Sequence, residues 1–296
     1  MKETKGVDKR MNAMGELFKM LRVSRNVSLK EATGNEFSHS MLSRFENGES
    51  DMTITKLLVG LKNIRTDLDE FIYLYNDFKP SDYTILKENI WQVLSKKDLN
   101  KLNKMYLEEI SKYTISQKED HFFNALIIKG HMFILDESTQ LTEKEQEKMY
   151  DYLFLVDIWG EYELKLFSDI SPLISLNLYF EYTREMMKKI DFLGELRKNR
   201  NLVHSILLNG LFKSTYENNL TKAAYFNQMI QKRFFNDNDL YLRTVYMIAN
   251  GHYLYCKGEK DLGINQIRDA IYVLKLLKCD EIADYYKRQF SDILVN

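Results

Sequence analysis

The stretch from Ser38 to Gly48, with the sequence SHSMLSRFENG, predicts a short helix with two different sides. Serine is a favoured N-cap residue, and glycine commonly follows the last residue of a helix. Met41, Leu42 and Phe45 fall at helical spacing on a narrow apolar side. The other sides carry polar or basic residues, namely His39, Ser40, Ser43, Arg44 and Asn47. We therefore expect one side of this helix to pack on a core and the other to face solvent or a partner.

Four more helices are expected around this one, at 11–25, 29–34, 53–64 and 67–78. The second of them follows a capping box, in which the Ser28 hydroxyl accepts from a backbone N–H and Glu31 reaches back to the N-cap. In the last two, helical spacing places eight apolar residues toward a core: Ile54, Leu57, Leu58, Leu61, Leu68, Phe71, Ile72 and Tyr75. Residues 1–78 therefore predict a five-helix domain.

The two short helices in the middle of this domain are typical of a motif whose second helix enters the major groove of DNA. Ser, His and Arg side chains can hydrogen-bond base edges, and Arg pairs bidentately with guanine. The candidates for base edges are His39, Ser40 and Arg44, those for phosphates are Arg25, Lys30 and Asn47, and Ser38 and Ser43 share the same DNA-binding face. The alternative is a helical bundle whose polar face is only solvated.

Two longer motifs favour the DNA-binding interpretation. The segment from Leu21 to Gly48 resembles a Cro/repressor-type helix-turn-helix, and the resemblance implies a structural ion pair between Arg22 and Glu46. The run EFSHSMLSRFENGESD, residues 36–51, is similar to the Rgg/GadR/MutR regulators of Gram-positive bacteria. This family would be expected to bind double-stranded promoter DNA. Some of its members carry a cysteine just after this run, whereas residues 52–55 here are Met-Thr-Ile-Thr, so no disulfide between heads is expected.

Composition predicts an all-α chain of two domains. Of the 296 residues, only 12 are Gly and 2 are Pro, far below the roughly 12% that is average for these two residues together. So few Gly and Pro argue against sheets with many tight turns.

Pro80 is a plausible joint between domains because the residue before proline avoids helix. We expect a DNA-binding domain at 1–78, a linker at 79–84 and a second domain at 85–296. Residues 1–66 hold 12 Lys and Arg against 8 Asp and Glu, so the first domain is the basic one.

The second domain is expected to be an α-solenoid of tetratricopeptide-like helix pairs. Capping boxes at Ser116–Glu119 and Thr142–Glu145 predict helix starts near 117 and 143. Breaks in the apolar pattern define pairs near 119–159, 161–194, 195–235 and 240–278, with a last helix at 281–294. Units of roughly 35–40 residues fit such repeats, whose stacking forms a concave surface that can bind an extended peptide. An irregular helical bundle is the alternative.

The segment YLFLVDIWGEYE, residues 152–163, resembles a block of the Rgg C-terminal domain. The resemblance implies a homodimer whose repeat domain holds a short signalling peptide, with Trp159 and Tyr162 as packing residues. We place much of the dimer contact in 240–294, because end repeats expose apolar faces. Some family members carry a basic, peptide-contacting residue after this block, but residues 167–172 contain none.

Asparagine suits the binding of a peptide backbone because its side chain both donates and accepts hydrogen bonds. The candidates on groove-facing helices are Asn177, Asn209, Asn227 and Asn250. Asn209 interrupts an apolar run, so it must find a hydrogen-bond partner or lose stability. It also falls where the family places a groove asparagine. Asn209, Tyr241 and Asn250 form the predicted peptide site, with Arg243 near it. An ordinary hydrogen bond between helices is the alternative for each asparagine.

Other classes of function have little support. The five histidines show no i, i+4 pair, and there is no HExxH, CxxC, Walker or GxGxxG motif, so we expect no enzyme, no metal and no cofactor. No apolar stretch approaches the ~18 residues of a membrane span, and no signal peptide is evident, so a cytoplasmic location is the default. Cys256 and Cys279 are expected to be buried fillers. The alternatives are a helical protein-binding adaptor and a regulator that works without a peptide.

Overall fold

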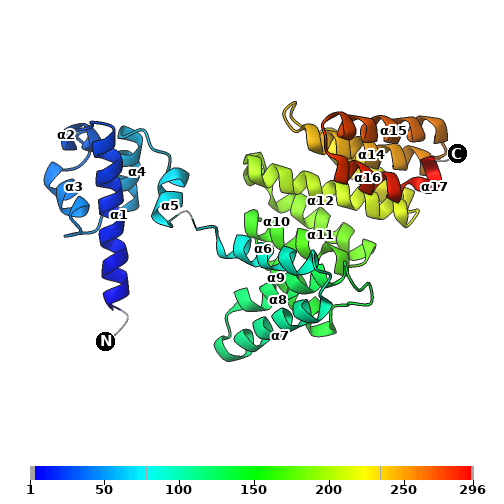
Figure 1. Ribbon diagram of the computed structural model, residues 1–296, viewed down its shortest axis with the longest axis horizontal. Coiled ribbons are helices and arrows are strands. Elements are labelled where there is room, and N and C mark those ends of the chain that lie inside the picture. The colour runs from blue at the N-terminus through cyan, green and yellow to red at the C-terminus, as the bar shows by residue number, and fades with distance from the viewer. Residues whose placement is uncertain (1–3, 78, 234, 295–296) are drawn as a thin grey trace. The chain divides into compact units, whose positions relative to one another are not determined.

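The computed structural model describes residues 4–77, 79–233 and 235–294, and every regular element in these residues is a helix (Figure 1). The predicted all-α class is therefore confirmed. The chain divides into two compact units, Met1–Asn89 and Ile90–Asn296. Helix α6 (Asp82–Leu94) begins inside the expected linker. The boundary between the two units, after Asn89, lies within this helix.

The first unit contains the five expected helices. They are α1 (Thr4–Ser24), α2 (Leu29–Thr33), α3 (His39–Glu46), α4 (Ile54–Asn63) and α5 (Leu68–Tyr75). The Ser28 capping box is confirmed, because Ser28 Oγ accepts from the Glu31 N–H at 3.2 Å and Glu31 Oε2 accepts from the Ser28 N–H at 2.8 Å. The core is built around Phe18, Leu42, Ile64 and Phe71, whose side chains are fully buried.

A close approach of α1 and α3 fixes the position of the second short helix. A Cβ built on Gly15 would lie 1.9 Å from the Phe45 carbonyl oxygen, so only glycine fits where the two helices meet. The Phe18 and Phe45 rings then meet edge to face at 6.2 Å. The α1–α3 contact therefore depends on one missing side chain and two aromatic rings.

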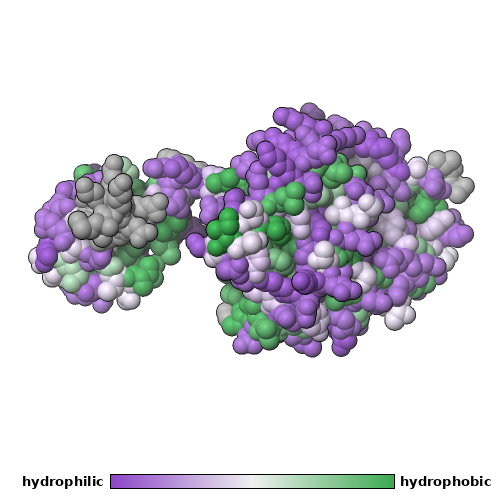
Figure 2. Space-filling view, turned by 90° about the horizontal axis from the view of Figure 1, so that it is seen from below, coloured by the Kyte–Doolittle hydropathy of each residue, from purple (hydrophilic) through white to green (hydrophobic). Residues whose placement is uncertain are grey.

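The predicted inward face of α4 and α5 is too wide. Ile54 is 59% exposed, and Leu58, Leu68 and Ile72 are also exposed. The buried positions are Leu57, Leu61, Ile64 and Phe71. Each helix is covered on one side only, so the core takes a narrower stripe than the apolar pattern suggested. Figure 2 shows apolar side chains reaching the surface among hydrophilic ones.

The second unit is a stack of helices, which Figure 1 shows with α7 and α8 at one end and α14 and α15 at the other, while α16 and α17 lie back beside α14. After α6 come α7 (Leu99–Ser116), α8 (Glu119–Met132), α9 (Glu143–Leu155), α10 (Glu161–Ile170), α11 (Leu176–Lys189), α12 (Arg197–Tyr216), α13 (Leu220–Lys232), α14 (Leu240–Lys257), α15 (Lys260–Leu276), α16 (Asp280–Gln289) and α17 (Ser291–Leu294). Short 3₁₀ turns, η1 (Ser171–Leu173) and η2 (Asp191–Glu195), precede α11 and α12. Successive pairs pack together, and α8, α10, α12 and α14 contact one another in that order. This is the expected solenoid.

One of the two predicted capping boxes of this unit is wrong. Ser116 is the last residue of α7, and its hydroxyl donates to the Lys112 carbonyl at 2.7 Å. Gln117 then adopts a left-handed conformation, with φ 56°, and α8 begins at Glu119. The box at Thr142 is confirmed, because the Thr142 N–H donates to Glu145 Oε2 at 2.7 Å. Ser116 fails because the same hydroxyl that caps a helix start can bond back to the helix it ends.

Aromatic contacts pack the helices of the second unit together. Trp159 is fully buried, and its indole N–H donates to the Leu153 carbonyl at 3.0 Å. Tyr162 is partly exposed but packs against Phe123 and Tyr152. Both residues thus make packing contacts. Within the described ranges, no helix is long and apolar enough to cross a membrane.

Candidate functional site

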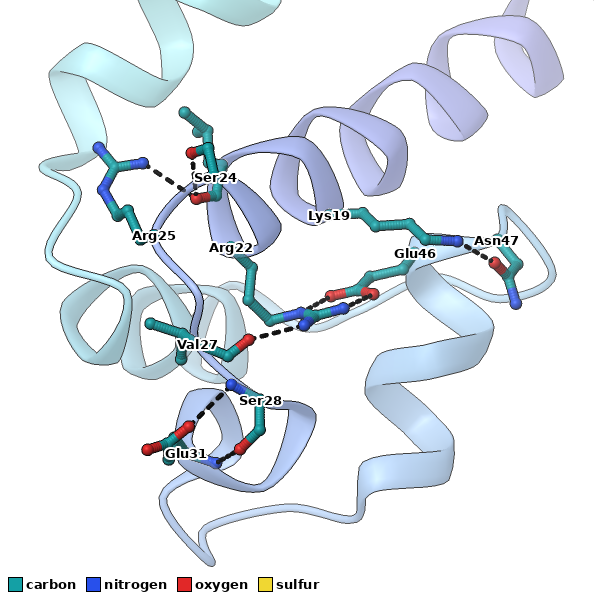
Figure 3. A network of polar contacts seen from close by, with 10 residues as sticks. Lys19, Arg22, Ser24, Arg25, Val27, Ser28, Glu31, Glu46 and Asn47 are labelled. Carbon is teal, nitrogen blue, oxygen red and sulfur yellow. Dashed lines mark hydrogen bonds and ion pairs between the residues drawn. The ribbon is translucent and has the colours of Figure 1, made fainter.

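Arg22 and Glu46 form a buried ion pair between α1 and the end of α3 (Figure 3). Arg22 Nε donates to Glu46 Oε1 at 2.6 Å and Arg22 Nη2 to Oε2 at 2.7 Å, which is bidentate geometry. Arg22 Nη1 also donates to the Val27 carbonyl at 2.7 Å. The hydrogen bonds that Arg22 donates to Glu46 outweigh the effect of burial and raise the pKa of Arg22. One guanidinium therefore ties α1, α3 and the turn before α2 together.

Helix α3 presents the polar side that the sequence predicted. Ser38 is its N-cap, with Oγ accepting from the Met41 N–H at 3.2 Å and lying 3.2 Å from Ser40 Oγ. The side chains of His39, Ser40, Arg44 and Asn47 are exposed, and Ser43 is half-buried. Leu42, Phe45 and Glu46 are buried on the opposite side. A partner that approaches α3 from solvent would thus meet the residues chosen as DNA contacts.

The basic side chains around α3 differ in the contacts that hold them. Arg44 is exposed, and its Nε lies 3.9 Å from a carboxylate oxygen of Glu49, which is also exposed. Lys30 is exposed on α2. Arg25, in contrast, donates to the Leu21 carbonyl at 3.2 Å and lies 3.6 Å from Glu70 of α5. Arg25 therefore connects α1 to α5.

Lys19 was not predicted as a DNA contact from the sequence, but its side chain lies beside Asn47 at the end of α3. Lys19 Nζ donates to Asn47 Oδ1 at 3.0 Å, and both side chains are exposed (Figure 3). The signal available in the sequence was the spacing, since Lys19 is three residues before Arg22 and so lies near it on the α1 surface. Lys19 therefore adds a cation beside the end of α3.

A cavity of about 270 Å³ lies in the second unit between α12, α14 and α16. Its lining is Ser205, Leu208, Asn209, Phe212, Tyr216, Tyr241, Leu242, Val245, Tyr285 and Tyr286. Asn209 and Tyr241, predicted together from the sequence, are thus brought together here. Asn209 has no hydrogen-bond partner among the described residues. It is exposed, because the neighbouring Leu208 and Gly210 turn the apolar run inward while Asn209 faces the cavity.

The other asparagines are occupied by contacts between helices. Asn250 Nδ2 donates to Gln266 Oε1 at 3.0 Å, between α14 and α15, and Asn250 is not part of the cavity lining. Asn227 is buried and accepts from the Tyr246 hydroxyl at 2.8 Å. Asn177 accepts from Lys222. The structure therefore separates Asn250 from Asn209 and Tyr241, and the alternative of an interhelical bond holds for it.

Arg243, expected near the peptide site, holds the loop before α14. Its guanidinium donates to the Phe235 carbonyl at 3.0 Å, to the Asn236 carbonyl at 3.1 Å and to Asp237 Oδ1 at 2.7 Å. These bonds fix the chain that leads into Tyr241. In the described part of the chain, no cluster of His, Cys, Asp and Glu could hold a metal ion.

Comparison with known proteins decides the family. The sequence profile of the C-terminal domain of the helix-turn-helix transcriptional regulator Rgg matches residues 88–288, about two thirds of the chain. The chain belongs to the Rgg family. The family consists of helix-turn-helix transcriptional regulators, and the helix-turn-helix arrangement of α1 to α5 agrees with that description.

Solved structures agree with the fold of this Rgg chain over nearly its whole length. The SHP pheromone receptor Rgg2 of Streptococcus dysgalactiae is 25% identical, with a TM-score of 0.81 over 94% of this chain and 99% of that one. A transcriptional regulator from Listeria monocytogenes EGD-e is 21% identical, with a TM-score of 0.80 over 96% and 98%. The PrgX/cCF10 complex is 13% identical, with a TM-score of 0.73 over 96% and 92%. The last two show the fold alone.

The aromatic lining of the cavity in this Rgg chain was not predicted. Tyr216, Tyr285 and Tyr286 lie on two helices far apart in sequence, so only the fold could bring them to one place. Burial, together with Tyr285, raises the pKa of Tyr216 to about 12. Its phenol is therefore neutral at pH 7 and can both donate and accept a hydrogen bond.

His252 packs against this aromatic cluster. It is buried, its ring lies 5.0 Å from Tyr216 and 5.1 Å from Phe290, and its Nδ1 is 2.9 Å from Thr215 Oγ1. Burial lowers the pKa of His252 to about 4. The neutral ring acts as a packing residue for one wall of the cavity.

Proposed function

We propose that this Rgg-family regulator binds specific double-stranded DNA through α3 and that a short peptide in the cavity between α12, α14 and α16 controls this binding. The proposed domains are 1–78 for DNA, 79–84 as linker and 85–296 for peptide and dimer contacts. The exposed polar side of α3, held by the buried Arg22–Glu46 pair, is the observation that carries the proposal.

The DNA contacts divide by chemistry. His39, Ser40 and Arg44 are proposed to read base edges, since they project from the first turns and the exposed side of α3. Lys30, Asn47 and Lys19 are proposed to meet phosphates, which position the helix but carry no sequence information. Ser38 and Ser43 belong to the same face, with Ser38 also capping the helix. Arg25 remains a weaker phosphate candidate because of its contact with Glu70.

A mobility-shift series on the full chain tests this division. Arg44→Ala is expected to cost about 1–3 kcal/mol and to relax preference at one base position. Lys30→Ala is expected to weaken all sequences alike and to reduce the salt dependence by about one counterion. Arg197→Ala, an exposed change outside the DNA-binding unit, is the control. If Arg44→Ala leaves affinity and preference intact, α3 is not the recognition helix and the adaptor alternative gains.

Three observations support a peptide as the ligand of the cavity. Its lining is largely aromatic and apolar, which suits burial of apolar side chains. Asn209 is exposed there and makes no hydrogen bond within the described residues, so its amide is free for a peptide backbone. The Rgg2 structure, matched over most of both chains, is that of a pheromone receptor.

Titration with candidate peptides encoded beside the gene, followed by tyrosine fluorescence, tests the cavity. Asn209→Ala is expected to weaken binding by about 1–3 kcal/mol, because the bound peptide would be left with an unpaired buried group. Asn250→Ala is the matched control, since its amide bonds Gln266 outside the cavity. If no peptide binds the wild-type chain, the regulator works without a peptide at this site.

A further inference from the structure

Four lysines gather where α6 passes into α7, at the start of the second unit. The nine-residue segment KKDLNKLNK, which begins at Lys96, holds these four lysines and one acidic residue. Lys96 and Lys97 lie in the turn that follows α6, where Lys97 adopts a left-handed conformation with φ 53°. Lys101 and Lys104 lie three residues apart at the start of α7. These four residues are called the lysine patch below.

The side chains of the lysine patch face solvent and have few counter-ions. All four are exposed. Lys104 Nζ lies 4.0 Å from Glu108 Oε1, but in the described part of the chain no ion pair joins the other three lysines to a carboxylate. Asp98 is the N-cap of α7, and its Oδ1 accepts from the Lys101 backbone N–H at 2.9 Å. The patch therefore keeps a net positive charge.

Helix α7 differs from other helices of this unit in the charge at its start. The N-terminal end of a helix carries a partial positive charge, which favours acidic side chains and disfavours lysine. Acidic residues stand in the first turns of α8, α9 and α16, whereas α7 has none after its N-cap. Lysines at this place gain no local stabilisation, which favours a role in binding an anionic partner.

We propose that the lysine patch binds phosphates of double-stranded DNA beside the bases that α3 reads. Lysine ammonium groups pair with phosphates as point charges, and such contacts add affinity without regard to base sequence. The inference rests on the proposed function, because α3 is what brings a duplex to this chain. It adds to that function a DNA contact made by the repeat domain.

The chain itself limits how far the patch can lie from a bound duplex. Six residues separate α5 from α6, and they span at most about 25 Å when extended. The 13 residues of α6 add about 20 Å, and the step to Lys96 adds about 7 Å. Lys96 is therefore never more than about 50 Å from the end of α5, the length of roughly 15 base pairs. Such tethering makes a contact effective that would be weak on its own.

Fluorescence anisotropy of labelled DNA, titrated with the full chain at several salt concentrations, tests the proposal. Two duplexes of roughly 40 base pairs are used, one from beside the gene and one of scrambled sequence. The test variant carries Lys96→Gln, Lys97→Gln, Lys101→Gln and Lys104→Gln. We expect it to bind both duplexes roughly tenfold or more weakly than the wild-type chain. The slope of log affinity against log salt should become shallower by up to about 0.9 for each lysine.

The matched control removes four exposed lysines from other parts of the second unit. It carries Lys118→Gln, Lys144→Gln, Lys198→Gln and Lys232→Gln. Its net charge changes as much as that of the test variant, so a loss confined to the test variant is an effect of position. Both variants should melt like the wild-type chain, because every replaced side chain is exposed and glutamine suits a helix.

The proposal is overturned if the test variant keeps the affinity and salt dependence of the wild-type chain, or if the control loses as much. It is also overturned if the four lysines matter for sedimentation with phosphatidylglycerol vesicles but not for duplex binding, since the partner is then a membrane surface. Arg44→Ala separates this result from the proposed function. That variant reports on the preference between the two duplexes, whereas the lysine patch acts on both alike.

Discussion

At the scale of single residues, Arg22 and Glu46 decide whether the DNA-binding unit holds its shape. Each is buried, and their pairing leaves no charge uncompensated. Reversing one charge, as in Arg22→Glu, is expected to destabilise the unit by about 3–5 kcal/mol, because the remaining charge stays buried without a partner. The double reversal Arg22→Glu with Glu46→Arg should recover part of this loss. Hydrogen exchange of the α3 amides in the full chain measures it, and strictly additive effects would mean that the two residues do not pair.

His252 predicts a pH dependence of stability. Its folded pKa of about 4 lies below the ordinary value of 6.5, so the unfolded chain takes up the proton first as the pH falls. The contribution is fully present above pH 6.5 and is lost between pH 6.5 and 4, by about 1.4 kcal/mol for each pH unit. Urea unfolding at pH 7.5 and 5.5 should therefore show a smaller loss for His252→Gln than for the wild-type chain. Equal losses would show that His252 is not the group responsible.

At the scale of elements, the α1–α3 contact is the most sensitive to change. Gly15→Ala would place a methyl group against the Phe45 carbonyl, so the helices must separate. We expect a loss of about 1–3 kcal/mol, as is typical of overpacking, and weaker DNA binding as a consequence. Glu16→Ala, the exposed neighbour on α1, is the control. The contact is not essential if Gly15→Ala matches that control in both hydrogen exchange and DNA affinity.

The sequence predicts these elements well where local signals agree. Ser28, Ser38 and Thr142 cap helices as expected, because a cap depends on a few neighbouring residues. Ser116 shows the limit, since one hydroxyl can serve the end of a helix as well as its start. Contacts between distant segments could not be predicted from the sequence, and one example is the lining of a single cavity by Tyr216 and Tyr285.

The same distinction separates the predicted site residues. The polar side of α3 could be read from one helix, because its exposed and buried residues alternate within a dozen positions. Asn209 and Asn250 look alike in sequence, since both are polar residues in apolar helices. Only the packing of α15 beside α14 gives Asn250 a partner in Gln266 and leaves Asn209 facing the cavity. Which asparagine is free is a property of the tertiary structure.

At the scale of the whole molecule, we propose a homodimer in which two α3 helices read two half-sites. Exposed apolar residues on α15, namely Leu262, Tyr272 and Leu276, are available for contact in the proposed dimer region 240–294. For helix-turn-helix dimers the half-sites lie about 34–36 Å apart, or a multiple of this. Footprinting should show two protected segments at that spacing. A monomer in sedimentation at micromolar concentration, both with and without DNA, would contradict the dimer.

Peptide binding and DNA binding are expected to be coupled within one molecule. A ligand can shift an equilibrium only through different affinities for two states, so peptide must change DNA affinity and DNA must change peptide affinity by the same factor. The direct test is fluorescence anisotropy of labelled DNA from beside the gene, titrated with the full chain with and without its peptide. We expect the peptide to change DNA affinity by about 5- to 150-fold, and the Asn209→Ala variant to need more peptide for the same change. Specific DNA binding that is identical at every peptide concentration, although the peptide is bound, would contradict it.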